Sequence, residues 1–432
     1  MVERVNRAGR NRTRAGMGKR PAATADIGAW LRARASLPAL GAAVLMFCLT
    51  VYNGRHSGID MMDNSFVVKA AQAFRDGGSP YADKRFLYFP SSVLLAVPQT
   101  YLPVRLLRWL VPAATAAMVV AGWFLALRIF RVSALSRLSV LGVLLFCFLS
   151  PFRNLVQLGN WTAYSALALP AALLLAHRSR WVWAGVVVGL AIATKPMLVP
   201  LALLFLIARR PRAFLAAAAV PLVLAGAAAA VMPDPGLFFT RTLPFLLHGQ
   251  DEFARPYDAS LGTLLPRLGV PDGLATACAV ALAVALLAGA WRRWRLDGDG
   301  ADASGAGGGE ALRLVESGSM LMLAALVVSK PSFDHYLFVF LPVLLASVVL
   351  PGAAARSGWL AVVLVPRLAG FSYVRLDPVQ NWAFSVAAVN VVFSLVLLHR
   401  TFFGGRQRRE EDGSVDDRAV RAGGGAEQRV GL

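Results

Sequence analysis

Apolar runs close to the length of a membrane-spanning helix recur from one end of this chain to the other. A helix needs about 20 apolar residues to cross the hydrocarbon core of a bilayer. Of the 432 residues, 57% are hydrophobic and 16% are charged, whereas a soluble globular protein carries about 25% charged residues. The pattern therefore predicts an all-α polytopic membrane protein.

We expect about twelve transmembrane helices, some of them short or interrupted by proline. The predicted spans are 37–53, 106–130, 138–152, 161–177, 181–194, 197–208, 213–232, 273–291, 312–328, 335–350, 358–371 and 381–399. Residues 91–104 are apolar, but the segment is short and contains proline. A re-entrant or interfacial segment is expected there.

The basic residues indicate how the chain is oriented. The formal net charge is +20, and Lys and Arg gather at the ends of apolar runs. Such residues mark cytoplasmic loops beside anionic lipid. Alternating the predicted spans from a cytoplasmic N-terminus places five basic clusters inside: 128–137, 178–180, 209–212, 292–295 and 400–409. This favours membrane lipids over nucleic acid as their partner, and predicts a multi-pass cell (plasma) membrane protein with both termini cytoplasmic.

The two ends of the chain differ in composition from its middle. Residues 1–36 are basic and poor in apolar residues, and residues 401–432 are rich in charged residues and glycine. Both segments are expected to be disordered cytoplasmic tails. Residues 37–400 form the predicted transmembrane domain, in which the Gly/Asp/Ala-rich stretch 297–310 is typical of a flexible linker.

The same alternation places a second group of charged residues at the non-cytoplasmic boundary. Its members are Asp60, Asp63, Arg153, Lys195, Arg241, Lys330 and His335. Cations there oppose the positive-inside bias, and charge within a membrane is costly. In one interpretation each cation extends separately to a lipid headgroup. In the other, the cations and the acids together form a site for a membrane-bound phosphate with an acid–base partner.

Asp60 and Asp63 are three residues apart, so in a helix they share one face. They follow the first apolar run directly, beside apolar residues that hold them near the lipid surface. They are either solvated loop acids or the catalytic edge of a membrane enzyme.

Three further positions have the chemistry of an anion or sugar site. Lys195-Pro196 and Lys330-Pro331 each break an apolar run, and proline leaves backbone groups free near the ammonium. Gln157 and Asn160 bracket Gly159 at another span mouth. Their amides can hold a sugar hydroxyl or a phosphate oxygen, or they can cap the helix that begins near residue 161.

Motifs of soluble enzymes are missing from the sequence. There is no Walker loop, no dinucleotide fingerprint in strand context, no HExxH and no G-x-S-x-G. Cys48, Cys147 and Cys278 stand singly within apolar runs, without the spacing of a metal site. Neither a metal nor a soluble cofactor is therefore expected.

Several stretches resemble glycosyltransferase family 87, a family of polytopic GT-C enzymes that use polyprenyl-phosphate sugars. The first is Asp63-Asn-Ser-Phe-Val67-Val68-Lys-Ala70-Ala71, which is similar to the first outer-loop motif of the family. The others are Leu87-Tyr88-Phe89-Pro90, Gln157-Leu-Gly159-Asn160, Lys195-Pro196 and the segment from Ser329 to His335. The resemblance covers about residues 37–400 and implies a GT-C fold.

The run from Asp234 to Pro244 is most similar to family members that add α-1,3 arabinofuranose branches to the arabinan of arabinogalactan and lipoarabinomannan in actinobacteria. The resemblance thus implies inverting transfer of arabinofuranose from a polyprenyl-phosphate donor to a glycan acceptor, with the active site on the outer, periplasmic face. It implies that Asp63 is the general base and Asp60 a secondary acid. Lys195, Arg241, Lys330 and His335 are the expected contacts of the donor phosphate, and Tyr88, Gln157 and Asn160 those of the sugar or acceptor.

Two alternatives stay open at this point. A polyprenyl-phosphomannose donor presents the same phosphate and lipid, so residue spacing does not separate it from the arabinose donor. A lipid or glycan transporter, such as a flippase, also fits twelve spans with both termini inside. The lack of an internal repeat and the gathering of charges at one membrane face favour the enzyme over the transporter.

Overall fold

The computed structural model describes residues 22–59, 61–248, 255–296, 308–369 and 377–424. Within these residues the chain is helical, and β-pairing is limited to an isolated bridge between Arg34 and Ser136. The α-helices are α1 (Ala22–Arg32), α2 (Leu37–His56), α3 (Met62–Arg75), α4 (Pro90–Ala96), α5 (Val104–Ile129), α6 (Arg137–Phe148), α7 (Ser150–Leu158), α8 (Thr162–His177), α9 (Trp181–Thr194), α10 (Val199–Ile207), α11 (Pro211–Ala230), α12 (Leu243–His248), α13 (Leu261–Arg267), α14 (Asp272–Leu296), α15 (Gly308–Val328), α16 (Leu341–Ala346), α17 (Gly358–Ala369) and α18 (Pro378–Gly424).

Shorter helical turns connect them. The 3₁₀ segments are η1 (Pro80–Ala82), η2 (Val97–Tyr101), η3 (Pro196–Leu198), η5 (Arg255–Tyr257), η7 (Asp334–Val339), η8 (Ser347–Val349) and η9 (Ala354–Arg356). Segment η4 (Phe238–Thr242) is a π-helix. The predicted interfacial segment 91–104 consists of α4 and η2, both far too short to span a bilayer.

Six of the described helices are long and apolar enough to cross a membrane, namely α2, α5, α11, α14, α15 and α18. A seventh span results if α6 and α7, which meet at an angle of 69°, are counted as one. Helices α8, α9 and the η3–α10 segment are apolar but shorter. The all-helical, multi-pass architecture is confirmed, whereas the expected number of twelve spans is not.

Proline explains two of the differences. The predicted span 138–152 bends between α6 and α7, and the predicted span 335–350 is divided among η7, α16 and η8. Pro151 and Pro342 occupy the first turns of α7 and α16. Proline has no N–H to continue a preceding helix, but its fixed φ favours the start of a new one.

The described parts of both predicted tails are largely helical. Helix α1 lies within the predicted N-terminal tail, and α18 continues through most of the predicted C-terminal tail to Gly424. Arg32 of α1 donates a hydrogen bond to the Phe130 carbonyl (3.0 Å). A Cβ on Gly28 would lie only 2.9 Å from the Val349 carbonyl oxygen, so α1 packs closely against η8. Most of the predicted linker, 297–307, lies outside the described residues.

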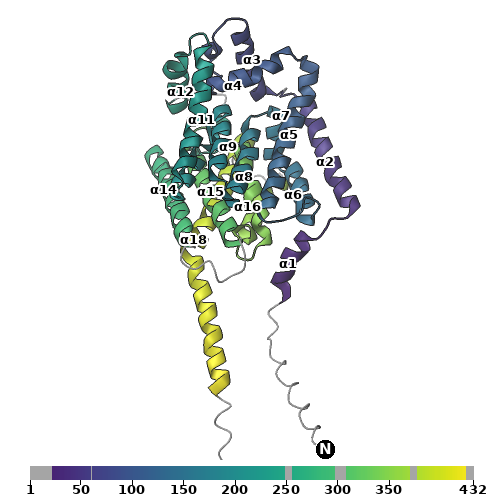
Figure 1. Ribbon diagram of the computed structural model, residues 1–432, viewed down its shortest axis with the longest axis vertical. Helices are drawn as coiled ribbons and strands as arrows, with labels where there is room; N and C mark the ends of the chain where they lie inside the picture. The colour runs from purple at the N-terminus through teal and green to yellow at the C-terminus, as the bar shows by residue number, and fades with distance from the viewer. Residues whose placement is uncertain (1–21, 60, 249–254, 297–307, 370–376, 425–432) are drawn as a thin grey trace, which may run out of the picture.

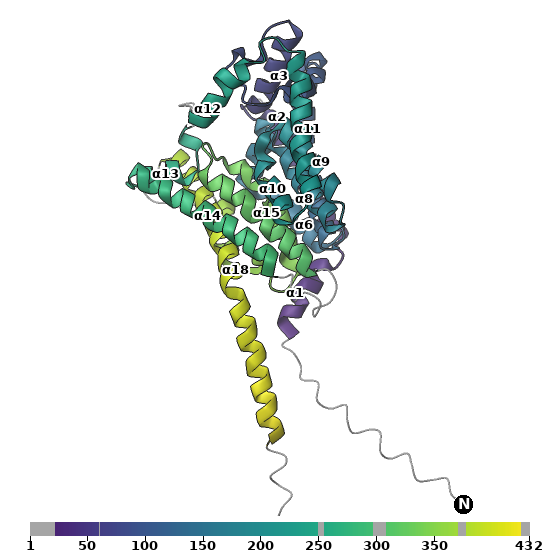
Figure 2. The same cartoon turned by 60° about the vertical axis from the view of Figure 1, so that its left-hand side comes forward.

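The helices form one elongated bundle with two distinct ends (Figures 1 and 2). Helix α1 and the far end of α18 lie at one end, and α3, α4 and α12 lie at the other. A large apolar core runs through the bundle around α5, α8 and α15. A smaller, aromatic-rich core is built from Tyr81, Phe86, Tyr88, Trp161 and Phe238, and it supports the end that carries α3.

Candidate functional site

The aromatic core fixes Tyr88 in the loop before α4. Its ring centroid lies 5.9 Å from that of Phe86 and 5.8 Å from that of Trp161, and the Tyr81 hydroxyl donates to the Tyr88 carbonyl (3.1 Å). Burial, reinforced by the negative charge of Asp63, raises the pKa of Tyr88 well above its ordinary value. Tyr88 is therefore a rigid, neutral phenol close to Asp63.

Asp63 is located in the first turn of α3, where a carboxylate is favoured by the helix dipole. The turn before it is anchored, because Met61 has a left-handed conformation and its N–H donates to the Gln157 carbonyl (3.2 Å). The Asp63 side chain is half-buried, and its Oδ2 accepts a hydrogen bond from Asn160 Nδ2. The sequence thus places a carboxylate against the loop between α7 and α8.

Gly159 is responsible for the direction in which Asn160 points. It ends α7 in the left-handed region (φ 60°), and a Cβ there would lie 2.6 Å from Val111 Cγ1; only glycine meets both demands without strain. Asn160 Oδ1 then accepts from the Thr162 N–H (2.8 Å) at the start of α8, which agrees with the capping alternative for this side chain. The same oxygen accepts a second hydrogen bond, from Lys195 Nζ (2.8 Å).

Lys195 follows the last residue of α9 in an extended conformation and lies between two helices. Its Nζ also donates to Thr162 Oγ1 (2.8 Å) and lies 4.9 Å from the centroid of the Tyr336 ring. Burial lowers the pKa of Lys195 to about 8, although the neighbouring Asp63 acts in the opposite direction. At neutral pH the side chain is therefore an ammonium, and Asn160 and Thr162 occupy two of its three donors.

These contacts join four polar side chains from α3, the α7–α8 loop, α8 and the end of α9. We call Asp63, Asn160, Thr162 and Lys195 the Asp63 cluster. A carboxylate and an ammonium share one asparagine, so a proton acceptor and a cation lie within two hydrogen bonds of each other. Such a pair can accept a proton from a hydroxyl group and stabilise a neighbouring anion.

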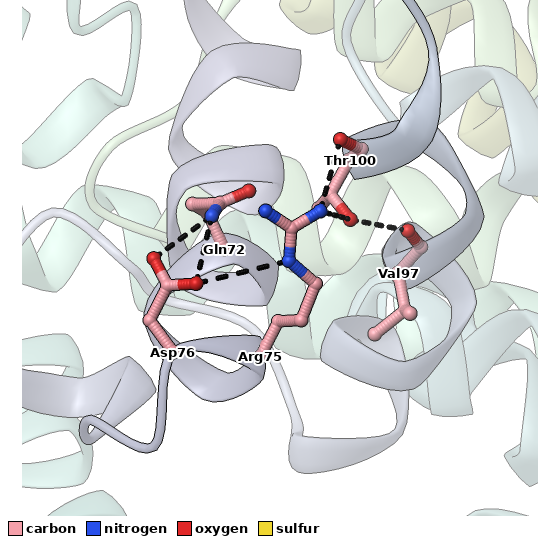
Figure 3. A network of polar contacts seen from close by, with 5 residues as sticks. All are labelled: Gln72, Arg75, Asp76, Val97 and Thr100. Atoms are coloured by element: carbon pink, nitrogen blue, oxygen red, sulfur yellow. Dashed lines mark hydrogen bonds and ion pairs between the residues drawn. The ribbon is translucent and has the colours of Figure 1, made fainter.

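Helix α3 is held at both ends by η2. Near the cluster, Asn64 is 3% exposed; its Nδ2 donates to Gln99 Oε1 (2.9 Å), and its Oδ1 accepts from Trp161 Nε1 (2.9 Å). At the other end of α3, Arg75 donates to the carbonyl and the hydroxyl of Thr100, both at 3.3 Å (Figure 3).

In the same view, Gln72 Nε2 contacts both oxygens of Asp76, and the Thr100 hydroxyl donates to the Val97 carbonyl. These contacts are internal to the end of α3 and to η2, so the orientation of α3 and of the carboxylate in its first turn depends on Asn64 and Arg75.

The other predicted phosphate contacts have different surroundings. His335 is 3% exposed, with Nδ1 3.3 Å from Asp334 Oδ1, and Asp334 Oδ2 accepts from Asn154 Nδ2 (2.8 Å). The His335 ring lies 4.9 Å from that of Tyr336, so it adjoins the cluster through this tyrosine. Lys330 is exposed and packs against Gly262 of α13, where an added Cβ would lie 2.7 Å from Lys330 Cε.

The remaining predicted residues lie on the periphery or cannot be placed. Arg241 is exposed, and its Nη1 donates to the Ala82 carbonyl (3.0 Å). The Gln157 side chain is half-buried, and its backbone carbonyl anchors the start of α3. Arg153 is exposed on α7. Asp60 lies outside the described residues.

Sequence reasoning missed three residues of this region. Thr162 is fully buried and could have been identified from its position two residues after a capping asparagine. Tyr336 has no local signal, because it reaches the cluster from more than 130 residues away in the chain. Asn64 was predicted only as part of the motif that begins at Asp63, yet it links α3 to η2 and to Trp161, the residue before α8.

Within the part of the chain that the structure describes, no group of three or more His, Cys, Asp or Glu side chains lies close enough together to hold a metal ion. The chemistry that can be traced here is that of a carboxylate, an ammonium, two tyrosines and an asparagine.

Comparison with known proteins identifies relatives. The profile of glycosyltransferase family 87 matches residues 86–309, more than half of the chain, a range that includes Tyr88, Asn160 and Lys195 but begins after Asp63. The alpha-(1->3)-arabinofuranosyltransferase of Mycobacterium tuberculosis is 28% identical over 346 residues, which cover 78% of this chain and 76% of the relative. The protein of the same name from Mycolicibacterium smegmatis is 28% identical over 288 residues, covering 65% and 64%. No solved structure matches this chain.

Proposed function

Because this chain belongs to glycosyltransferase family 87, we propose that it transfers arabinofuranose from a polyprenyl-phosphate donor to a glycan acceptor, forming α-1,3 branches in arabinan. The family and the apolar helices make it a multi-pass membrane glycosyltransferase, which leaves the transporter hypothesis without support. The sugar, the linkage and the lipid donor are the proposed part. The names of the mycobacterial relatives support the sugar and the linkage.

One observation carries the mechanism: Asp63 and Lys195 are joined through the same asparagine. In the proposed reaction an acceptor hydroxyl attacks the anomeric carbon from the face opposite the phosphate, so the configuration inverts. The bond between that carbon and the phosphate oxygen breaks, and the products are the new glycoside and polyprenyl phosphate. Asp63 takes the proton of the attacking hydroxyl as general base.

Lys195 stabilises the charge that develops on the leaving phosphate. Its position is set before the donor binds, because Asn160 and Thr162 hold the ammonium. Arg241 and Lys330, both exposed, are proposed as additional contacts of the donor phosphate, and Asp60 as a secondary acid. His335 is proposed to act at the same phosphate from beside Tyr336.

The proposed sugar and acceptor contacts are Tyr88, Asn160 and Gln157. The Tyr88 ring also faces the Lys195 ammonium, 5.8 Å away, so a sugar bound there would lie beside the phosphate contact.

We further propose that the site faces the outer, periplasmic side and that both termini are cytoplasmic. The support is structural, because α3 lies at the end of the bundle opposite α1 and the far end of α18 (Figure 1). It is also electrostatic, because the arginines at 209–212 and 292–295 fit the cytoplasmic side.

The test is to incubate the purified protein with an arabinan oligosaccharide and, in separate reactions, with polyprenyl-phosphate arabinofuranose or polyprenyl-phosphate mannose. Product formation is followed by mass spectrometry, and the new linkage is determined by NMR. We expect an α-1,3-linked arabinofuranosyl product with the first donor and none with the second. A product formed only with the mannose donor would replace arabinofuranose by mannose in the proposal.

A further inference from the structure

A cavity of about 150 Å³ adjoins the Asp63 cluster. One wall is a face of α5, where lining residues recur at helical spacing: Leu107, Leu110, Val111, Ala114 and Met118. Helix α5 is one of the candidate membrane spans. The cavity therefore borders both the proposed reaction centre and the bilayer.

The rest of the lining is mixed. Its polar side chains are Asn64, Gln99, Thr115, Asn160 and Tyr164, and apolar surface makes up most of the wall. The amide of Asn64 is engaged by Gln99 and Trp161, and that of Asn160 by Asp63, Lys195 and the backbone of α8. Because most of the wall is apolar, most hydroxyl groups of a sugar placed here would be buried without partners, which is costly. The lining favours an apolar occupant.

The size of the cavity limits how much of an apolar chain it can take. A dry cavity of about 150 Å³ lined by apolar side chains is large enough for benzene. One isoprenoid unit has five carbon atoms and is therefore of similar size. The cavity shares Asn160 with the ammonium of Lys195, so a unit seated in it lies one side chain away from the proposed phosphate contact.

We propose that this cavity binds the isoprenoid unit next to the phosphate of the lipid donor. The inference rests on the proposed function and adds the place where the lipid is recognised. The remainder of the lipid then continues along the outer part of α5 into the bilayer, where Leu106 and Leu110 are 40% and 45% exposed. Residues of α5 thereby select donors by the first unit of their lipid.

The test fills the cavity and compares donors that differ only in their lipid. Ala114 lines the cavity and is exposed on α5, so Ala114→Phe adds a ring at this position without entering the main core. The control is Ala121→Phe, an exposed position two turns further along the same helix that does not line the cavity. Three donors are used: a polyprenyl-phosphate sugar, a single-isoprenoid-phosphate sugar and a methyl-phosphate sugar.

For Ala114→Phe, we expect the KM of both isoprenoid donors to rise about tenfold, as for other mismatches in apolar pockets. The kcat/KM of the methyl-phosphate donor and the KM of the acceptor should stay at their wild-type values. The Ala121→Phe variant should match the wild type with all donors. Unchanged KM values for the isoprenoid donors, or a raised KM for the acceptor alone, would overturn the lipid assignment.

A second measurement needs no substitution. A donor whose first isoprenoid unit carries a photoreactive group should crosslink to a peptide that contains residues 107–118, and labelling elsewhere would place the unit outside the cavity. Failure of the proposed function is distinguishable from failure of this inference. If the wild type transfers from no polyprenyl-phosphate donor, the proposed function fails; if it transfers but filling and crosslinking contradict the expectation, only the lipid site fails.

Discussion

Two lysine–proline pairs interrupt apolar helices in this chain, and the structure gives their lysines different surroundings. Lys195, after α9, is half-buried and donates to Asn160 and Thr162. Lys330, after α15, is exposed beside Gly262. In the sequence the two breaks look alike. The difference teaches that a helix break supplies a candidate anion site, while partners from elsewhere in the chain decide whether its cation is positioned.

The two environments have different energetic consequences for a bound phosphate. Lys195 is already held by two oxygens, so little side-chain entropy remains to be lost when an anion binds. An exposed lysine such as Lys330 loses up to about 2 kcal/mol of rotamer freedom when it is immobilised. Positioned groups in a site with little water also stabilise developing charge more strongly than solvated ones do. We therefore expect catalysis to depend on Lys195 far more than on Lys330.

The largest effect should come from Asp63, the acid that shares Asn160 with Lys195. Asp63→Asn keeps the size of the side chain but removes the proton acceptor, and we expect kcat to fall about 1,000-fold with little change in donor KM. Asp83→Asn, at an exposed position at the same end of the molecule, is the matched control. Asp60→Asn is assayed in parallel. If Asp63→Asn keeps near wild-type turnover and Asp60→Asn loses it, Asp60 rather than Asp63 is the general base.

The next effect compares the lysines directly. Lys195→Met retains most of the apolar stem and removes the charge, and we expect kcat/KM for the donor to fall about 100-fold. Lys330→Met should change it by less than about threefold. Initial rates over a range of donor concentrations provide both values. Equal losses in the two variants would mean that local chain geometry, rather than the fixed partners, determines phosphate binding.

The pH dependence sharpens the same contrast. Burial lowers the pKa of Lys195 from 10.5 to about 8, so its ammonium is present at pH 7 and is lost as the pH rises through 8. We therefore expect kcat/KM for the donor to decline above pH 8. Lys195→Arg should keep its charge over this range, since arginine is not deprotonated in proteins, and its profile should lack the decline. If kcat/KM of Lys195→Arg declines above pH 8 as in the wild type, the decline is caused by a group other than Lys195.

The smallest effect should come from the ring beneath the ammonium. Tyr336 lies 4.9 Å from Lys195 Nζ, within the range of a cation–π contact. Tyr336→Leu should lower kcat/KM by about tenfold, while Tyr336→Phe, which keeps the ring, should stay within about threefold of the wild type. A large loss in Tyr336→Phe would instead indicate that the hydroxyl takes part in the reaction.

The sequence was sufficient for features that depend on short stretches of chain. The apolar runs predicted an all-helical membrane protein, and the turn at Gly159 indicated that Asn160 lies at the start of the following helix, with capping as one of its two possible roles. The number of spans was not predictable in this way, because hydropathy does not separate protein contacts from lipid contacts. In α15, 83% of the most apolar window is buried within the protein, compared with 22% in α2. An apolar helix inside the bundle therefore resembles one that faces lipid.

Similar limits apply to the candidate site. Asp63, Asn160 and Lys195 were predicted to belong to one site, but nothing in the sequence gave the hydrogen bonds that join them or separated Lys195 from Lys330. Tyr336 became visible only when η7 was found beside the end of α9. Long-range contacts, set by how α8 and α9 pack, are the information that local pattern lacks.

A double-mutant cycle on kcat/KM for the donor tests the central claim most directly. Asn160→Ala is combined with Lys195→Met and, separately, with Lys330→Met. Contacting residues show coupling energies of about 0.5–3 kcal/mol, whereas independent residues are additive to within about 0.5 kcal/mol. We predict coupling of at least about 1 kcal/mol for the Asn160–Lys195 pair and additivity for the Asn160–Lys330 pair. Additivity of Asn160 with Lys195, or coupling only with Lys330, would contradict the account.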